Sequence, residues 1–292
     1  MSLLPQELHQ EIKAKLTAFN QTPIEIGNVS AVGGGSINHA ARVEADGSNY
    51  FVKWNKREAF PQMFFKEQRG LKLLATGNHI RIPQVIATDE LETVAYLLTE
   101  WIESGSETDS FWESFGERLA ALHHETNEQF GLDHDNYMGS LQQSNTREFT
   151  WADFFVNHRL EPQVKMAVDA GFSFDRSFDH IFKLLKTEVP EESPSLIHGD
   201  LWSGNFMVDS SNAPVLIDPA AYYGHRESDI AMTTLFGGFS SNFYEFYNKA
   251  FPMESGWQER LPLHNLYPLL VHVNLFGSGY VNQVNQILRN FK

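Results

Sequence analysis

The spacing of hydrophobic residues predicts a helix near the start of the chain. Leu8, Ile12, Leu16 and Phe19 recur at intervals of three or four residues, so they share one face of an amphipathic helix. Similar spacing predicts further helices over residues 64–74 and 111–122. The chain therefore mixes helical segments with the strand patterns that lie between them.

A strong turn signal predicts a β-hairpin in the first third of the chain. Asp46 and Gly47 stand between two short runs of strand-forming residues, and an Asp-Gly pair is typical of a two-residue hairpin turn. Because side chains alternate along a strand, Val52 and Trp54 should point to one face and Lys53 to the other.

The distribution of these patterns predicts an α+β protein with two unequal lobes. Two more strands are expected at 81–88 and 93–102, and a small polar segment follows them. The remainder is mainly helical in pattern, except for a strand-like island at 195–218. We expect a small β-rich lobe at 1–102 and a larger, mainly helical lobe at 103–292.

Composition narrows the classes of function. The 292 residues are 42% hydrophobic and 20% charged, which is typical of a globular protein, and the net charge of -15 disfavours binding to nucleic acid or to anionic membrane surfaces. With no cysteine, disulfides, cysteine nucleophiles and thiolate metal sites are excluded. No signal-peptide pattern is visible at the N-terminus, so we expect a cytoplasmic protein.

The strand-like island carries the main chemical motif. His198, Gly199 and Asp200 are followed by Asn205 and, after a short predicted hairpin, by Asp218 at the end of an apolar run. This order and spacing is that of a kinase catalytic loop followed by a metal-binding aspartate. Asp200 suits a base for the attacking hydroxyl, and Asn205 and Asp218 offer the oxygen ligands that Mg²⁺ prefers.

The first lobe supplies candidates for binding a nucleotide. A glycine-rich run before a strand lets the backbone approach phosphates closely, although a flexible turn explains it equally well. This run consists of Gly33, Gly34, Gly35 and Ser36. Lys53 lies on the next strand and Glu67 on the following helix, as in the lysine–glutamate pair of kinases.

Several longer segments identify a family. The chain resembles the fructosamine kinase (ketosamine-3-kinase) family, within the aminoglycoside phosphotransferase and choline kinase group of protein-kinase-like folds. The segments that carry the resemblance are GGGSINHA, YFVK, HGDLWSGN, LIDPAAYYGHRESDIAM, LFGGF and LYPLLVHVNLFGSGY. They span nearly the whole chain, and the segment after Asp218 narrows the match to the ketosamine branch.

The resemblance implies ATP- and Mg²⁺-dependent phosphorylation of a sugar hydroxyl, expected to be O3, on a ketosamine such as fructosamine or ribulosamine. Lys53 and Glu67 would orient ATP, Gly33 to Ser36 would cover its phosphates, and Asp200 would be the base. Asn205 and Asp218 would bind the metal. The hinge that contacts adenine would consist of Glu100, Trp101 and Ile102.

Residues near the catalytic motif are candidates for the acceptor pocket. Trp202, Tyr222 and Tyr223 offer flat faces for a sugar, and Glu227 and Asp229 offer charges for an amine. Asp229 has a second interpretation, as a buried residue that hydrogen-bonds the catalytic loop. No activation segment of the protein-kinase type follows Asp218.

Two alternatives remain open. One is another small-molecule kinase of the same group, acting on an aminoglycoside, choline or a homoserine-like alcohol; the other is a nucleotide-binding scaffold without activity. The segment after Asp218 argues against the first, and the complete set of motif residues argues against the second. As partners we expect a ketosamine, a glycated amine or a glycated protein, with the chain a monomer or a weak dimer.

Overall fold

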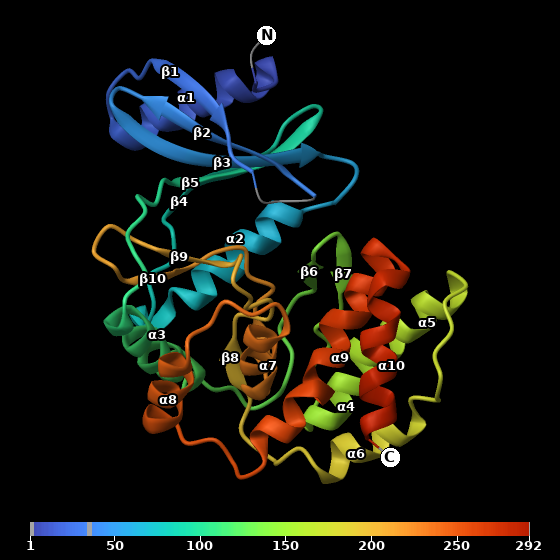
Figure 1. Ribbon diagram of the computed structural model, residues 1–292. Helices are drawn as coiled ribbons and strands as arrows, with labels where there is room; N and C mark the ends of the chain where they lie inside the picture. The colour runs from blue at the N-terminus through green and yellow to red at the C-terminus, as the bar shows by residue number, and fades with distance from the viewer. Residues whose placement is uncertain (1–2, 34–36, 292) are drawn as a thin grey trace.

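The computed structural model describes residues 3–33 and 37–291 and has a small upper lobe and a larger lower lobe (Figure 1). The upper lobe contains α1 (Gln6–Asn20), β1 (Ile26–Ala31), β2 (His39–Ala45), β3 (Ser48–Lys56), β4 (Val85–Glu90) and β5 (Val94–Glu100). Helix α2 (Met63–Leu74), between β3 and β4 in the chain, lies below the sheet. A short 3-10 turn, η1 (Thr76–Asn78), follows α2. The α+β, bilobal fold expected from the sequence is confirmed.

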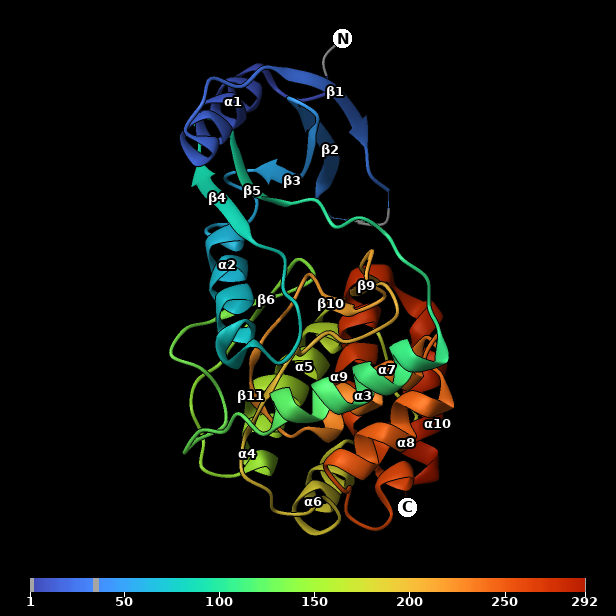
Figure 2. The ribbon, with the colours of Figure 1, turned by 90° about the vertical axis from the view of Figure 1, so that its left-hand side faces the viewer.

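The upper lobe is one antiparallel sheet with a helix packed on it. Its five strands lie in the order β1-β2-β3-β5-β4, and Figure 2 shows α1 beside the sheet. Leu8, Ile12 and Leu16 are buried and pack with Val52 of β3 in one core. Phe19, which the spacing placed on the same face, is instead 43% exposed.

The predicted hairpin is confirmed. β2 and β3 pair antiparallel from Ala45 opposite Ser48, and only Asp46 and Gly47 lie between them. Both turn residues have positive φ, 47° and 78°, which is the backbone of a type I′ turn. The turn sets the register of β3, and with it the face on which Lys53 lies.

Helix α2 connects the sheet to the lower lobe. Phe64 and Leu71 pack under the sheet against Leu97 of β5. On the other side, the Lys66 ammonium lies 4.9 Å from the ring centroid of Tyr137, in the lower lobe. The side chain of Glu67, between these contacts, is held at the junction of the two lobes.

The lower lobe is mainly helical around two hydrophobic cores. Its helices are α3 (Asp109–His123), α4 (Trp151–Phe155), α5 (Glu161–Asp169), α6 (Asp179–Thr187), α7 (Glu227–Leu235), α8 (Ser241–Ala250), α9 (Trp257–Phe276) and α10 (Val281–Asn290), with a π-helical turn η2 (Val156–Leu160) and a 3-10 turn η3 (Ser278–Tyr280). Within the described ranges, no helix combines the length and apolar character needed to cross a membrane.

Short strand pairs hold the loops of the lower lobe. They are β6 (Asn136–Met138) with β7 (Leu141–Gln143), β8 (Ser195–Ile197) with β11 (Tyr222–Gly224), and β9 (Phe206–Val208) with β10 (Pro214–Leu216). The last pair is the hairpin expected within the island. The boundary predicted at 102/103 falls in the segment between β5 and α3.

The close packing of α3 on α8 makes a testable prediction at Gly116. A Cβ atom built there would lie 2.4 Å from the Phe243 oxygen and 2.8 Å from the Tyr247 nitrogen, both in the backbone of α8. We expect Gly116→Ala to lower the free energy of unfolding by about 1–3 kcal/mol, because the backbones must separate. Urea denaturation measures this change.

A matched control lies in α2. Gly70 is also a helical glycine, but a Cβ atom there would meet only the Pro219 and Ala221 side chains, at ordinary distances of 3.5 and 3.7 Å. Gly70→Ala should be neutral or more stable by up to about 1 kcal/mol, because alanine favours the helix. Equal effects of the two substitutions would contradict the packing argument.

Candidate functional site

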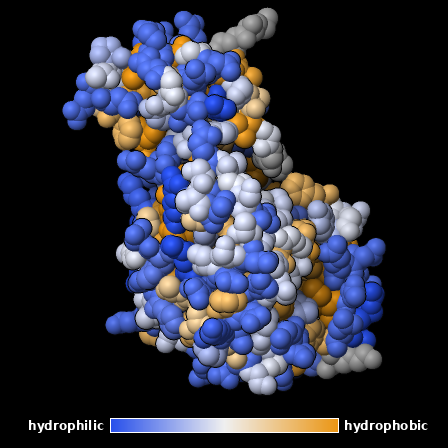
Figure 3. Space-filling view, turned by 60° about the vertical axis from the view of Figure 1, so that its left-hand side comes forward, coloured by the Kyte–Doolittle hydropathy of each residue, from blue (hydrophilic) through white to orange (hydrophobic). Residues whose placement is uncertain are grey.

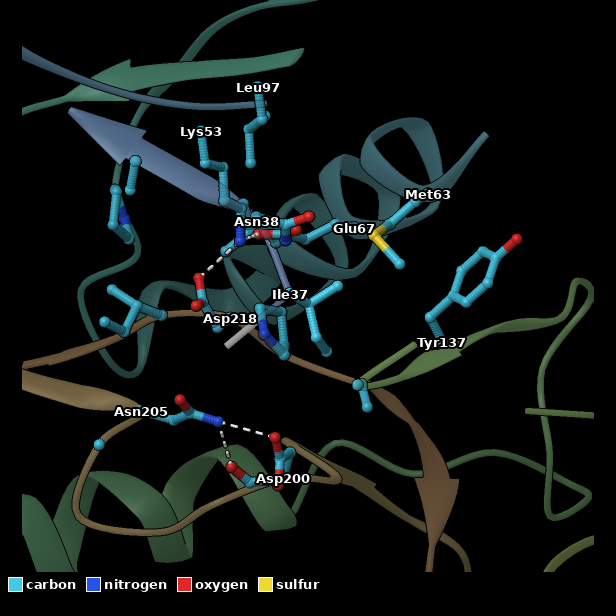
Figure 4. A pocket seen from close by; sticks show the side chains of 18 of the residues that line it. Ile37, Asn38, Lys53, Met63, Glu67, Leu97, Tyr137, Asp200, Asn205 and Asp218 are labelled. Carbon is cyan, nitrogen blue, oxygen red and sulfur yellow. Dashed lines mark hydrogen bonds and ion pairs between the residues drawn. The ribbon is translucent and has the colours of Figure 1, made fainter. Parts of the chain in front are cut away.

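Three charged residues from distant segments meet at the junction of the lobes. Lys53 Nζ lies 2.5 Å from Glu67 Oε1 and 2.7 Å from Asp218 Oδ1. Figure 4 shows Lys53 on β3, Glu67 on α2, and Asp218 below them on the lower lobe. The ion pair expected between Lys53 and Glu67 is present, and Asp218 joins it as a third member.

Burial sets the charges of this cluster. Lys53 is 5% exposed; burial opposes its charge, but the carboxylates of Asp218 and Glu67 outweigh that effect and raise the pKa of Lys53. Burial raises the pKa of Glu67 to about 7, against the lowering effect of Lys53. Lys53 is therefore a permanent cation that faces the cleft between the lobes.

The loop after β8 carries the second half of the site. Asn205 Nδ2 donates to the Asp200 backbone oxygen at 2.8 Å and to Asp200 Oδ2 at 2.9 Å. The Ile217 N–H donates to the Asn205 backbone oxygen, so the β9–β10 hairpin ties the loop to the segment of Asp218. Burial raises the pKa of Asp200 to about 7. A carboxylate in this state is a stronger base than an exposed aspartate.

The side-chain oxygens of Asn205 and Asp218 are available as ligands for a cation. Asn205 uses its amide nitrogen on Asp200, which leaves Oδ1 as an oxygen ligand. The Asp218 side chain is 50% exposed to the cleft, and this residue has φ +53° although a proline follows it. Such a conformation costs free energy in a non-glycine residue and is typical of functional sites. Carboxylate and amide oxygens fit Mg²⁺.

The structure corrects the substrate interpretation of Asp229. This residue is 1% exposed, and its carboxylate accepts from the backbone N–H groups of His198 at 2.7 Å and Gly199 at 2.9 Å. His123 Nε2 lies 3.2 Å from the same carboxylate. Asp229 therefore holds the catalytic loop from below, which was its second interpretation.

Glu227 is likewise no substrate contact. Its side chain is fully buried, with Oε1 2.5 Å from Arg260 Nη2 and Oε2 3.2 Å from His264 Nε2. His225, Glu227 and His264 lie close enough together to suggest a metal site. However, His225 Nδ1 accepts a hydrogen bond from the Glu227 backbone N–H. With Arg260 already neutralising the carboxylate, this cluster is structural.

The two tyrosines are also placed differently from the prediction. Tyr222 is 2% exposed, and the buried Arg159 guanidinium lies 4.2 Å from its ring centroid, so its face is covered. Tyr223 packs at the edge of a core and does not line the cleft. Trp202 does line the cleft and remains a candidate for contacting the acceptor.

The site residues surround one cleft of ≈ 580 Å³ between the lobes. Figure 3 shows the notch between the lobes, with hydrophobic side chains at its edge. Of the predicted nucleotide contacts outside the charged cluster, those that line the cleft are Gly33, Glu100, Trp101 and Ile102. Gly34, Gly35 and Ser36 lie outside the described residues.

Other lining residues were not predicted as site residues, although Ile37 and Asn38 fall within a segment that supported the family resemblance. These lining residues come from the segment before β2, from the β6–β7 hairpin and from the end of α9: Ile37, Asn38, Tyr137, Met138, Gly139, His272, Leu275 and Phe276. The α9 group falls within a segment that supported the family resemblance, but no spacing rule assigns it to a site. Only the packing of α9 against α7, α5 and α10 within the lower lobe brings it there.

The buried His225 is expected to make stability fall in acid. Burial lowers its pKa from 6.5 to about 4, and His264 adds to this effect. The unfolded chain therefore takes up a proton between these pH values that the folded protein excludes, so the contribution of His225 to stability is full above about pH 6.5 and is lost as pH falls towards 4. Glu67 and Asp200, whose pKa values burial raises to about 7, act in the opposite direction over the same range. The contribution of His225 is therefore measured as the difference in urea midpoint between the wild type and a His225 variant from pH 7.5 to 5.

A variant separates His225 from the other titrating groups. His225→Gln should change the slope of the unfolding free energy against pH by about one proton, so that the variant loses less stability in acid than the wild type. His180→Gln, which replaces an exposed histidine, is the control and should keep the wild-type slope. Buried His198, whose pKa burial also lowers, accounts for part of the remaining slope. An unchanged slope in His225→Gln would exclude this origin.

The fold and the site together define a class of protein. A five-stranded lobe with a strand lysine paired to a helix glutamate, above a loop with Asp200 and Asn205, is the architecture of protein-kinase-like phosphotransferases. The chain belongs to the fructosamine kinase family, whose model matches residues 8–292.

Individual relatives agree with this assignment. A probable ketoamine kinase of Enterococcus faecium is 42% identical, over 91% of this chain and 95% of its own. A chloroplastic protein-ribulosamine 3-kinase of Arabidopsis thaliana is 37% identical, over 91% of this chain and 83% of its own. A solved structure assigned as a fructosamine-3-kinase, from Thermobifida fusca YX-ER1, is 36% identical and covers 95% of this chain and 98% of its own, with a TM-score of 0.84.

Proposed function

We propose that the protein transfers the γ-phosphoryl group of ATP to a sugar hydroxyl of a ketosamine, with O3 as the acceptor atom. The observation that carries this proposal is the position of Lys53, Glu67 and Asp218 directly above Asp200 and Asn205 in one cleft. Family membership supports the ketosamine as the acceptor.

Asp200 performs the proton transfer in this proposal. Its carboxylate is held by Asn205 and has a pKa raised to about 7 by burial, so it accepts the hydroxyl proton more readily than an exposed aspartate. The hydroxyl oxygen then attacks the γ-phosphorus, and the bond to the β-phosphate oxygen breaks. Asp229 acts indirectly, because it fixes the loop backbone at His198 and Gly199.

Nucleotide and metal are bound by the residues on the other side of the cleft. Lys53 binds phosphate oxygens, and Glu67 fixes the direction of its side chain. Asn205 Oδ1 and the Asp218 carboxylate hold Mg²⁺, which supplies positive charge against the phosphates when bound. The hinge at Glu100 to Ile102 contacts adenine through backbone groups, since the Glu100 side chain pairs with Arg81.

The charge of the protein suits the proposed acceptor. The net charge of -15 attracts the cationic amine of a ketosamine, and the buried Lys53 confines positive charge to the phosphate end of the cleft. Free glycated amines and glycated proteins both present this group. We propose that the sugar enters beside Trp202, which lines the cleft two residues after Asp200.

The test is a direct assay of acceptors. The protein is incubated with Mg²⁺, ATP and a panel of fructosyl-, ribulosyl- and erythrulosyl-amines, with kanamycin and choline as members of the alternative class. Phosphorus NMR identifies the product and the phosphorylated position. We expect a 3-phosphate of one or more ketosamines. Phosphorylation of kanamycin or choline alone would replace the proposal with the aminoglycoside or choline kinase alternative.

A further inference from the structure

Five aromatic side chains form a continuous cluster at one end of the cleft. Phe236 lies between Trp202 and His272, with ring-centroid distances of 5.8 and 5.0 Å. His272 also contacts Phe276 at 5.4 Å and Tyr280 at 4.9 Å. We call Phe236, His272, Phe276 and Tyr280 the aromatic rim. Trp202 joins this rim to the catalytic loop.

Two phenylalanines of the aromatic rim expose apolar surface next to each other. Phe236 is 38% exposed and Phe276 is 53% exposed. Exposed hydrophobic residues normally occur singly, whereas these two contact the same imidazole, and a clustered patch of this kind marks a binding surface. Burial lowers the pKa of His272, so its ring is uncharged at neutral pH and adds to the apolar surface.

The rim is continuous with the proposed active site. His272 and Phe276 line the same cleft as Asp200, and because Phe276 is also half exposed, it lies at the mouth. The loop that carries Phe236 packs tightly on the catalytic loop: Gly238 has φ +94°, and a Cβ atom there would lie 2.7 Å from Ser203 Cβ. This packing places Phe236 next to the catalytic loop that carries Asp200.

We propose that the aromatic rim binds the substituent on the amine of the acceptor and favours ring-bearing, apolar substituents. This inference rests on the proposed function. A ketosamine has two ends, a sugar and an N-substituent. When a sugar hydroxyl reaches Asp200 beside Trp202, the N-substituent extends from the sugar towards the mouth of the cleft.

The chemistry of the rim matches this occupant. Aromatic faces stack on rings at centroid distances of about 4.5–7 Å, and they also attract a cation such as the ammonium of a ketosamine. Phe236 and Phe276 carry no charge, and burial lowers the pKa of His272, so its imidazole is neutral at neutral pH. The rim thus adds affinity for apolar rings without a competing ion pair.

The experiment compares two acceptors that share one sugar, N-benzyl and N-methyl ribulosamine. Binding of each is measured by calorimetry with a non-hydrolysable ATP analogue and Mg²⁺ present, and kcat/KM is measured with ATP. The wild-type protein should bind the benzyl compound about tenfold more tightly. In Phe236→Ala/Phe276→Ala, and to a smaller extent in Phe276→Ala alone, this ratio should approach one.

Phe19→Ala is the matched control, because Phe19 is 43% exposed but lies on α1, away from the cleft. It should retain the wild-type ratio. Equal binding of the two compounds by the wild-type protein, or an unchanged ratio in the rim variants, would overturn the inference. Failure of the proposed function looks different: the benzyl compound would still bind more tightly through the rim, but neither compound would be phosphorylated.

Discussion

Replacing Asp200 with asparagine is expected to lower turnover of the acceptor by about a thousandfold while nucleotide binding stays within about threefold of the wild type. The asparagine oxygen can still accept from Asn205 Nδ2, which now donates to Asp200 Oδ2 at 2.9 Å, so the loop should keep its conformation. In the proposed mechanism, the substitution removes only the group that accepts the hydroxyl proton. Steady-state kinetics with ATP and a ketosamine, together with calorimetric titration of ATP analogue, measure both quantities.

A control distinguishes this loss from a general effect of removing a negative charge. Asp109 lies in the first turn of α3 and is exposed, and Asp109→Asn should keep wild-type turnover. Turnover within tenfold of the wild type in Asp200→Asn would remove Asp200 from the role of base. A parallel loss of nucleotide binding would instead assign it to holding the nucleotide and metal.

Replacing Lys53 with methionine is expected to lower kcat/KM for ATP by about a hundredfold or more. Methionine fills a similar volume but leaves Glu67 and Asp218 without the ammonium that now lies 2.5 and 2.7 Å from them. The phosphates of ATP then meet the Glu67 and Asp218 side chains without the ammonium that now lies between these two groups. Initial rates at several ATP concentrations measure the effect, and circular dichroism checks the fold.

The same strand offers a matched control. Lys56 lies three residues further along β3 and is exposed, so Lys56→Met removes an equal charge without touching the cleft. It should leave kcat/KM for ATP within about twofold of the wild type. Similar losses in both variants would show that the net charge of the upper lobe, rather than the position of Lys53, governs nucleotide use.

Local patterns were sufficient to predict much of the upper lobe. The Asp46-Gly47 turn determines the register of β3, and alternation along that strand places Lys53 on the face opposite to Val52 and Trp54. Helical spacing predicts α2, although it says nothing of the 2.5 Å contact between Lys53 and Glu67. That contact was expected only because the order of residues matched a known arrangement.

The acceptor side shows where sequence reasoning fails. Glu227 and Asp229 stand next to the motif and carry charge, which suggested contact with an amine. Their partners are Arg260 and His123, 33 and 106 residues away in the chain, and these partners bury them. Whether a charged residue faces a site or is buried in a core network depends on its partners, which are distant in the chain. The spacing of neighbouring residues does not reveal these partners.

The sequence alone determined three of the helices, the hairpin at Asp46 and Gly47, the order of the motif residues and the family, because turns, side-chain periodicity and motif spacing are properties of neighbouring residues. Only the tertiary structure decided that Tyr222, Glu227 and Asp229 are internal, and that the end of α9 brings His272 and Phe276 to the mouth of the cleft. The physical reason is that burial depends on how whole elements pack, and packing joins residues far apart in the chain.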